Sequence, residues 1–151
     1  MLNSDYRDIL SIFNAEKVEY LVIGAYALAA HGLPRATGDI DLWINRDEPN
    51  ARRVWRALEK FGAPLLDLTQ DDLSSPGMVY QIGVAPNRID ILTSIDGVEY
   101  GDAWSQHIEV VIEGLPICII SRDHLIANKR AVGRPQDLAD IDRLEKETPK
   151  S

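Results

Sequence analysis

The segment from residue 21 to residue 44 constrains the fold of this chain more than any other part of the sequence. An apolar run over residues 21–23 ends at Gly24, and a short alanine-rich segment follows and stops at Gly32. Residues 39–44 then alternate two aspartates, Asp39 and Asp41, with apolar residues. Because side chains two apart on a strand share a face, the two carboxylates lie on one face and the apolar residues on the buried one. The segment predicts a strand, a glycine turn, a short helix and an acidic strand.

Two neighbouring carboxylates repel each other unless a cation lies between them, and a divalent metal is the usual candidate. A third aspartate, Asp90, lies between Ile89 and Ile91 in another short apolar run. If that strand neighbours the Asp39 strand, the three acids converge at one edge of the sheet. Three such carboxylates can hold two Mg²⁺ ions about 3.5–4 Å apart, as used for in-line displacement at phosphorus. The alternative is that the Asp-x-Asp pair is merely the solvent-facing side of a half-buried strand.

Gly24 and Ala25 lie where the first strand of this segment turns into the helix. Free backbone N–H groups and the positive end of the helix dipole can face an anion at such a turn. Gly24 also lets a phosphate approach the backbone closely. Only a short helix and a loop separate this turn from the aspartates, so an anion site and a cation site can lie together.

The rest of the chain predicts a mixture of strands and helices. Amphipathic helices are expected over residues 5–16 and from residue 47 or 48 to Gly62, strands over 78–84 and 88–92, and a hairpin over 107–119. Two helices close the chain, one from Ser121 and one from about Pro135, the latter with Leu138, Ile141 and Leu144 facing inward. Strict βαβ alternation is absent from this pattern. The expected fold class is therefore α+β, a small mixed sheet flanked by helices.

Length and composition limit the class of protein. A chain of 151 residues predicts one domain, residues 1–151. The net charge of −8 argues against a protein that mainly binds nucleic-acid backbones. The single cysteine, Cys118, excludes an internal disulfide framework and fits a reducing compartment. No run approaches the roughly 18 apolar residues of a membrane helix, and no secretory signal is visible, so we expect a cytoplasmic protein.

The order of these motifs resembles the nucleotidyltransferase superfamily, in which Gly-Gly or Gly-Ser before a helix is followed by Asp-x-Asp and a later single carboxylate. The closer resemblance is to the minimal bacterial group related to AbiEii-type toxins. That group has an apolar strand with Gly-Gly/Ala, an alanine-rich helix with His-Gly, and Arg-x-Thr-x-Asp-Ile-Asp-Leu. The matching segments here are residues 21–25, 31–32 and 35–42, with further likeness over residues 89–91 and 129–141.

This resemblance implies a nucleotidyltransferase-like fold with two C-terminal helices, and transfer of a nucleoside monophosphate from an NTP. Asp39 and Asp41 would bind Mg²⁺, with two ions expected, and Asp90 would complete the second metal site or accept the proton of the acceptor hydroxyl. The residues expected to contact the NTP phosphates are Gly24, Ala25, Arg35, Thr37 and Lys129.

Several of these residues also have a purely structural interpretation. Lys129 fits a solvated helix lysine, and Thr37 fits a residue that caps or shapes its loop. Arg35 either contacts phosphate or pairs with an aspartate and keeps the metal-free site neutral. Asp137 and Asp140 are most simply first-turn and outer-face acids of the last helix. Ala25 stands where many members of the group have glycine or serine, so only its backbone N–H is available to a phosphate.

Two classes of function stay open. The chain is either an Mg²⁺-dependent nucleotidyltransferase, in a toxin–antitoxin or defence system, or a weak or inactive relative that acts as a nucleotide-binding, antitoxin or regulatory partner. The acceptor hydroxyl could belong to a tRNA end, a protein or a small molecule. The aspartates favour the enzyme, whereas the small size and Ala25 favour the partner. An aspartyl phosphatase is disfavoured because its acidic pair follows the apolar strand, and a Rossmann site because Gly-x-Gly-x-x-Gly is absent.

Overall fold

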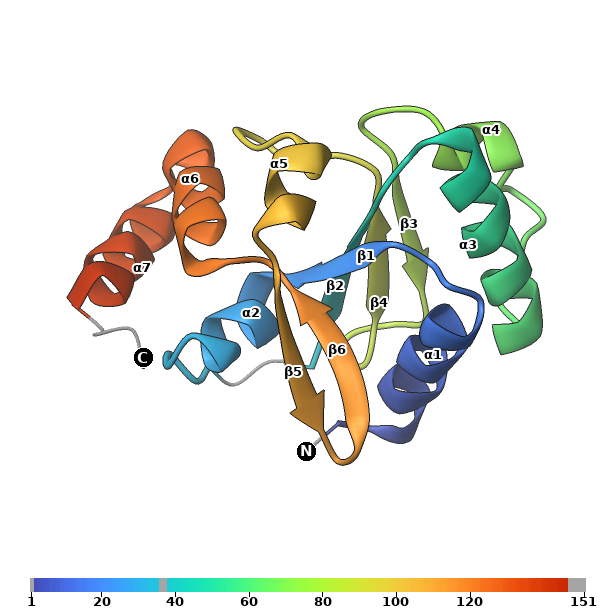
Figure 1. Cartoon of the computed structure of the whole chain (residues 1–151), viewed down its shortest axis with the longest axis horizontal. Coiled ribbons are helices and arrows are strands. Elements are labelled where there is room, and N and C mark those ends of the chain that lie inside the picture. Colours follow the sequence, from blue (N-terminus) through green and yellow to red (C-terminus); the bar gives the residue numbers. More distant parts are fainter. Residues whose placement is uncertain (1, 36–37, 147–151) are drawn as a thin grey trace.

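The computed structural model describes residues 2–35 and 38–146, and a single mixed sheet organises them (Figure 1). Its six strands have the order β3-β4-β2-β1-β6-β5. The strands are β1 (Tyr20–Ile23), β2 (Ile40–Ile44), β3 (Val79–Ile82), β4 (Ile89–Leu92), β5 (Ile108–Ile112) and β6 (Leu115–Ile119). The helices of the described part are α1 (Ser4–Ala15), α2 (Gly24–Ala30), α3 (Glu48–Phe61), α4 (Gln70–Leu73), α5 (Tyr100–Ser105), α6 (Arg122–Val132) and α7 (Pro135–Lys146). This architecture confirms the expected mixed sheet flanked by helices.

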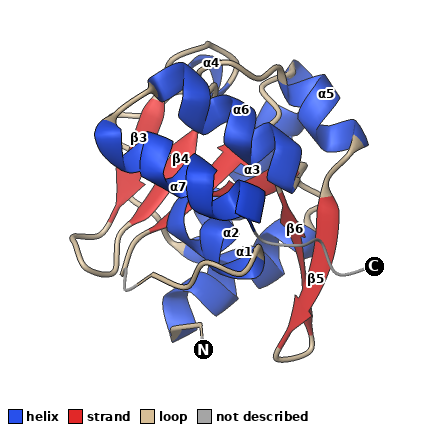
Figure 2. Ribbon diagram, turned by 90° about the vertical axis from the view of Figure 1, so that its left-hand side faces the viewer, coloured by secondary structure: helices blue, strands red, loops and turns tan. Residues whose placement is uncertain are grey.

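Two pairs of helices pack side by side in different parts of the molecule. The pair α1 and α3 lies on the right of Figure 1, and the C-terminal pair α6 and α7 lies on the left. Figure 2 shows the second pair from the side, in front of the sheet. Among the described residues, no helix has both the length and the apolar character needed to cross a membrane.

Strand pairing brings three strand ends to one edge of the sheet. β1 and β2 are antiparallel, with Ile23 opposite Asp41. β2 and β4 are parallel, with Asp41 opposite Asp90. The end of β1 therefore lies beside the start of β2, and the start of β4 lies on the other side of β2. This edge carries the predicted acidic site.

The core covers both faces of the central strand β2. Ile40, Leu42 and Ile44 are buried, as the alternating pattern predicts, and so is Trp43 on the opposite face. Asp41 shares the face of Trp43 and is partly exposed. A carboxylate at this position is therefore flanked by buried apolar residues, which makes its charged form costly.

Local capping signals explain where the main helices begin and end. The Asp47 side chain accepts a hydrogen bond from the backbone N–H of Asn50 at the start of α3, and Gly62 ends that helix in the left-handed conformation. The Ser121 side chain likewise accepts from the N–H of His124 at the start of α6. These residues mark the boundaries that the sequence predicts.

Candidate active site

Strand β1 passes directly into α2 at Gly24, and this turn lies against Asp41. Gly24 has φ of +69°, in the left-handed region that favours glycine. A Cβ atom at this position would lie 2.3 Å from Oδ2 of Asp41, far inside contact distance. Both the backbone conformation and the neighbouring carboxylate therefore require glycine here. The predicted proximity of the glycine turn and the acidic strand is confirmed.

A second glycine brings the segment before β2 close to the turn between β3 and β4. A Cβ on Gly38 would lie 1.4 Å from the carbonyl oxygen of Pro86, so no side chain fits between the two backbones. This close approach sets Asp39 beside the start of β4. The backbone N–H of Arg88 donates a hydrogen bond to Oδ1 of Asp39, at 3.1 Å.

The three predicted acids converge around the side chain of Arg88. Asp41 and Asp90 are register partners on adjacent strands, so their side chains leave the sheet on the same face. Arg88 Nε lies 2.7 Å from Asp90 Oδ1, and Nη2 lies 3.1 Å from Asp90 Oδ2. Nη2 also lies 3.4 Å from Asp39 Oδ2. One guanidinium thus bridges the carboxylates of Asp39 and Asp90.

The surroundings of Asp41 change its acidity. Burial raises the pKa of Asp41 to about 6, and the neighbouring carboxylates of Asp90 and Asp39 contribute to this rise, while Arg88 partly opposes them. Asp90 is itself only 7% exposed. A buried carboxylate with this elevated pKa is incompletely compensated, as expected of a group whose charged form requires an additional cation.

The donor chemistry of the acidic cluster fits a hard divalent cation, because Mg²⁺ prefers carboxylate oxygens. The arrangement is not preformed: within residues 2–35 and 38–146, no three His, Cys, Asp or Glu side chains are disposed as a metal site. Arg88 accounts for part of this, because its guanidinium engages both oxygens of Asp90. Binding of a metal by these residues would therefore require the side chains to rearrange.

The predicted phosphate-contacting cations Arg35 and Lys129 meet at one buried carboxylate. Arg35 Nη1 lies 3.1 Å from Asp140 Oδ2, and its Nη2 contacts Oδ1 of the same group. Lys129 Nζ lies 2.9 Å from Asp140 Oδ2 and 3.4 Å from Asp137 Oδ1. Arg134 completes the cluster through Nε, 2.7 Å from Asp137 Oδ2. This ion cluster ties the segment before Asp39 to α6 and α7.

The ion cluster corrects two interpretations of the sequence. Lys129 is 8% exposed, so it is not a solvated helix lysine, and Asp140 is fully buried, so it is not an outer-face acid. Asp137 does lie in the first turn of α7, as expected, but it is buried there. Burial alone would raise the pKa of Asp140, but hydrogen bonds from Arg35, Lys129 and Gln136 bring it down to about 2. Asp140 is therefore a buried, ionised partner of two cations.

Two further residues, Ala25 and Thr37, were predicted to contact the phosphates of the NTP. Ala25 follows Gly24 in the first turn of α2, so its backbone N–H is at the predicted position. Thr37 lies outside the described residues, and its role stays a prediction. Arg88 is the residue that sequence reasoning missed. Its position two residues before Asp90, within the strand expected over residues 88–92, was the available signal, because such side chains share a face.

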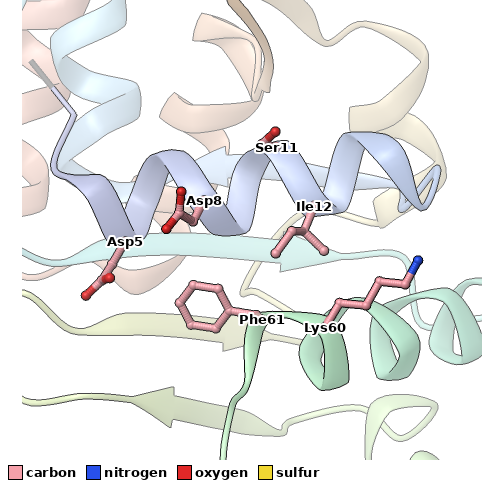
Figure 3. A pocket seen from close by; sticks show the side chains of 6 residues that line it. All are labelled: Asp5, Asp8, Ser11, Ile12, Lys60 and Phe61. Carbon is pink, nitrogen blue, oxygen red and sulfur yellow. The ribbon is translucent and has the colours of Figure 1, made fainter.

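A separate hollow of about 310 Å³ lies between α1 and α3. Figure 3 shows the side chains of Ile12 and Phe61 in the space between these helices. The described lining consists of Asp5, Asp8, Ser11, Ile12, Lys60 and Phe61. All of these residues belong to α1 or α3, so the hollow is distinct from the acidic cluster.

Comparisons with solved structures identify the fold. TM1012 from Thermotoga maritima, a protein assigned provisionally as a nucleotidyltransferase, matches with a TM-score of 0.65 and 18% identity over 98% of this chain and 97% of that one. The lincosamide antibiotic adenylyltransferase LnuA, solved with lincomycin, matches with a TM-score of 0.61 and 16% identity over 98% and 99% of the chains. ANT(2″)-Ia, solved with adenylyl-2″-tobramycin, matches with a TM-score of 0.59 and 18% identity over 92% and 84%.

At these identities the likeness establishes the fold, and the chain has the fold of the nucleotidyltransferases. No family model and no curated protein matches the chain. The expected fold class is thus confirmed, and the narrower resemblance to the AbiEii-related group stays a prediction.

Proposed function

We propose that this protein is an Mg²⁺-dependent nucleotidyltransferase that moves a nucleoside monophosphate from an NTP to a hydroxyl acceptor. The observation that carries the proposal is the convergence of Asp39, Asp41 and Asp90 beside the Gly24 turn. In the reaction the acceptor oxygen attacks the α-phosphorus, the bond to the β-phosphate breaks, and pyrophosphate leaves. The cytoplasm, which supplies Mg²⁺ and NTP, is the proposed compartment.

The acids would act as ligands and as a base. Asp39 and Asp41 would hold Mg²⁺, and Asp90 would complete the second metal site or take the proton of the acceptor hydroxyl. Bound magnesium would neutralise charge on the reacting phosphate and on the leaving pyrophosphate. The elevated pKa of Asp41 supports this assignment, because a cation bound there would restore its ionised form.

The triphosphate would lie against the glycine turn and the cations Arg35, before β2, and Lys129, in α6. At Gly24 the absence of a Cβ lets Asp41 lie against the turn, and Ala25, in the first turn of α2, would contribute its N–H to the phosphates. Arg35 and Lys129 share Asp140 and belong to a cluster of three cations and two buried acids. Because cations outnumber acids in this cluster, its field favours a polyanion near Arg35, four residues before Asp39. Thr37, between them in the sequence, is the further proposed contact.

A small molecule is the acceptor that the comparisons favour. LnuA is described with lincomycin, and ANT(2″)-Ia with an adenylylated tobramycin, so two proteins of this fold act on antibiotics. The net charge of −8 also disfavours a large contact with RNA by this chain alone. A protein hydroxyl on a toxin or antitoxin partner is the acceptor to test next.

The second candidate is a nucleotide-binding or regulatory partner with weak or no transferase activity. Two observations favour it: Ala25 has no hydroxyl, and Arg88 occupies both oxygens of Asp90, where a metal ligand is needed. A protein of this class would bind Mg²⁺ and NTP, or a partner protein, without turnover.

Thermal unfolding with Mg²⁺ and each NTP in turn, followed by incubation with α-labelled NTP and cell extract, separates the two candidates. A nucleotide at 100 times its Kd stabilises the folded state by about 2.7 kcal/mol. An enzyme is expected to show both this stabilisation and transfer of label to one fraction of the extract. Stabilisation without transfer supports the partner role, and the absence of both refutes the nucleotide site.

A further inference from the structure

We infer that Arg88 is the resident counter-cation of the acidic site: it binds Asp39 and Asp90 when no metal is present and competes with divalent cations for them. The inference rests on the proposed function in one respect, namely that these aspartates are metal ligands. It assigns to Arg88 the neutralising role that the sequence offered to Arg35, whose guanidinium instead engages Asp140.

The side chain of Arg88 makes several specific contacts with the aspartates, unlike an isolated ion pair at the protein surface. Nε and Nη2 engage Asp90 Oδ1 and Oδ2 at 2.7 and 3.1 Å, a fork-to-fork arrangement that is stronger than a single hydrogen bond. Nη2 additionally reaches Asp39 Oδ2 at 3.4 Å. The Asp90 side chain is 10% exposed, so this charge pair is shielded from water more than an ordinary surface pair.

The backbone of Arg88 is anchored, so only its side chain needs to move. The carbonyl oxygen of Arg88 accepts hydrogen bonds from the N–H of Ile40 at 3.0 Å and from the hydroxyl of Tyr6 at 3.1 Å. Its N–H donates to Asp39. The side chain itself is 30% exposed, which leaves it a route toward solvent. Release of the guanidinium therefore requires no change in the strand.

Competition follows from the geometry of the shared oxygens. Mg²⁺ and Mn²⁺ take carboxylate oxygens at close range in near-octahedral geometry, and a guanidinium on the same two oxygens of Asp90 blocks that approach. A metal that approaches these oxygens from the same side must displace Arg88, and one that uses their remaining lone pairs is repelled by the nearby guanidinium charge. The apparent metal affinity is accordingly lower than the affinity of the carboxylates alone, by the factor that the arginine contacts contribute.

The test is a titration of the full chain with Mn²⁺ in the absence of nucleotide, with free Mn²⁺ followed by its EPR signal. We compare the wild type with Arg88→Gln, which removes the charge and the fork, and with Arg56→Gln as a matched control. Arg56 loses the same charge, but its side chain is 56% exposed and pairs with Glu16. Arg88→Gln is expected to bind Mn²⁺ at least about ten times more tightly than wild type, and Arg56→Gln as wild type does.

An unchanged or weaker Mn²⁺ affinity in Arg88→Gln overturns the inference, as does equal tightening in Arg56→Gln. If far-UV circular dichroism shows that Arg88→Gln does not fold, Arg88→Lys replaces it. Lysine keeps the charge but loses the fork, so several-fold tighter binding is expected and no change overturns the inference. Because no nucleotide is used, failure of nucleotide transfer in the wild type refutes the proposed function without touching this result.

Discussion

Asp41 lies directly opposite Asp90 across the parallel pair of β2 and β4, and its carboxylate also contacts the turn at Gly24. These two acids come from segments 49 residues apart in the chain, yet their register places them on one face. Burial and mutual repulsion raise the pKa of Asp41 to about 6. The metal-free protein therefore holds a destabilising acidic pair at this sheet edge, as expected where function, and not stability, selects the residues.

Replacing Asp41 by asparagine should stabilise the metal-free protein near neutral pH. The folded-state pKa of about 6 lies above the ordinary 3.8, so the stabilising proton on Asp41 is fully present below pH 4 and is lost as the pH rises through 6. Asparagine cannot ionise, so Asp41→Asn avoids the destabilisation that ionised Asp41 causes. It should raise the free energy of unfolding at pH 7.5 by about 1–3 kcal/mol. Urea unfolding of wild type and Asp41→Asn at pH 4.5 and 7.5 measures the difference in their free energies of unfolding. A difference that is no larger at pH 7.5 than at pH 4.5 contradicts the account.

Replacing Gly24 by alanine should destabilise the fold through two additive causes. A residue with a Cβ is strained at φ of +69°, and that Cβ would meet Asp41 Oδ2 at 2.3 Å. The strain costs about 1–2 kcal/mol, and the overpacking adds about 1–3 kcal/mol.

Gly62→Ala is the matched control for Gly24, because Gly62 also has positive φ, +86°, but a Cβ added there would meet no atom within 4 Å. Only the strain applies at that position. Chemical denaturation of both variants should show the larger loss for Gly24→Ala. Equal losses of stability in the two variants would mean that a Cβ at position 24 makes no costly contact with Asp41.

Asparagine at position 140 should be strongly destabilising. Asp140 is fully buried and is the shared partner of Arg35 and Lys129, so its neutralisation leaves buried positive charge uncompensated. The expected cost is about 3–5 kcal/mol. The pKa of Asp140 is lowered to about 2, so its effect on stability changes with pH in the opposite direction to that of Asp41. Ionised Asp140 stabilises the fold fully above pH 4, and this stabilisation is lost as the pH falls toward 2.

The control for Asp140 is Asp142→Asn on the same helix. Asp142 is 66% exposed and pairs with Lys146 at the surface, so its loss should change the free energy of unfolding by less than about 0.5 kcal/mol. Thermal and urea unfolding of both variants give the comparison. A small cost at position 140 would show that the ion cluster contributes little.

The path from β1 through α2 to β2 was predictable because its signals are local. The apolar run, Gly24 and the alternation around Asp41 each act within a few residues. The short helix α5 was not predicted: the Glu99 side chain makes no capping hydrogen bond there, and the helix depends on packing of Tyr100 against Trp43, with ring centroids 4.9 Å apart. Such tertiary support leaves no periodic signal in six residues.

The contacts within the ion cluster of Arg35, Lys129 and Asp140 could not be predicted from the sequence. Arg35 and Asp140 are 105 residues apart in the chain. Their pairing also explains why Leu138, expected to face inward, is 52% exposed: positions 137, 140, 141 and 144 form the inner face of α7, and two of them are acids. Hydrophobic periodicity alone could not anticipate buried aspartates on that face.

The most direct test of the central claim is transfer of an α-labelled nucleoside monophosphate by the wild type, Asp41→Asn and the surface control Asp142→Asn. The reactions contain Mg²⁺ and either small hydroxyl-bearing acceptors or cell extract, and labelled product is counted. Wild type and Asp142→Asn are expected to transfer label at similar rates, and Asp41→Asn at least about a hundred times more slowly while remaining folded. Transfer by Asp41→Asn near the wild-type rate would contradict the assignment of the three aspartates as the catalytic site.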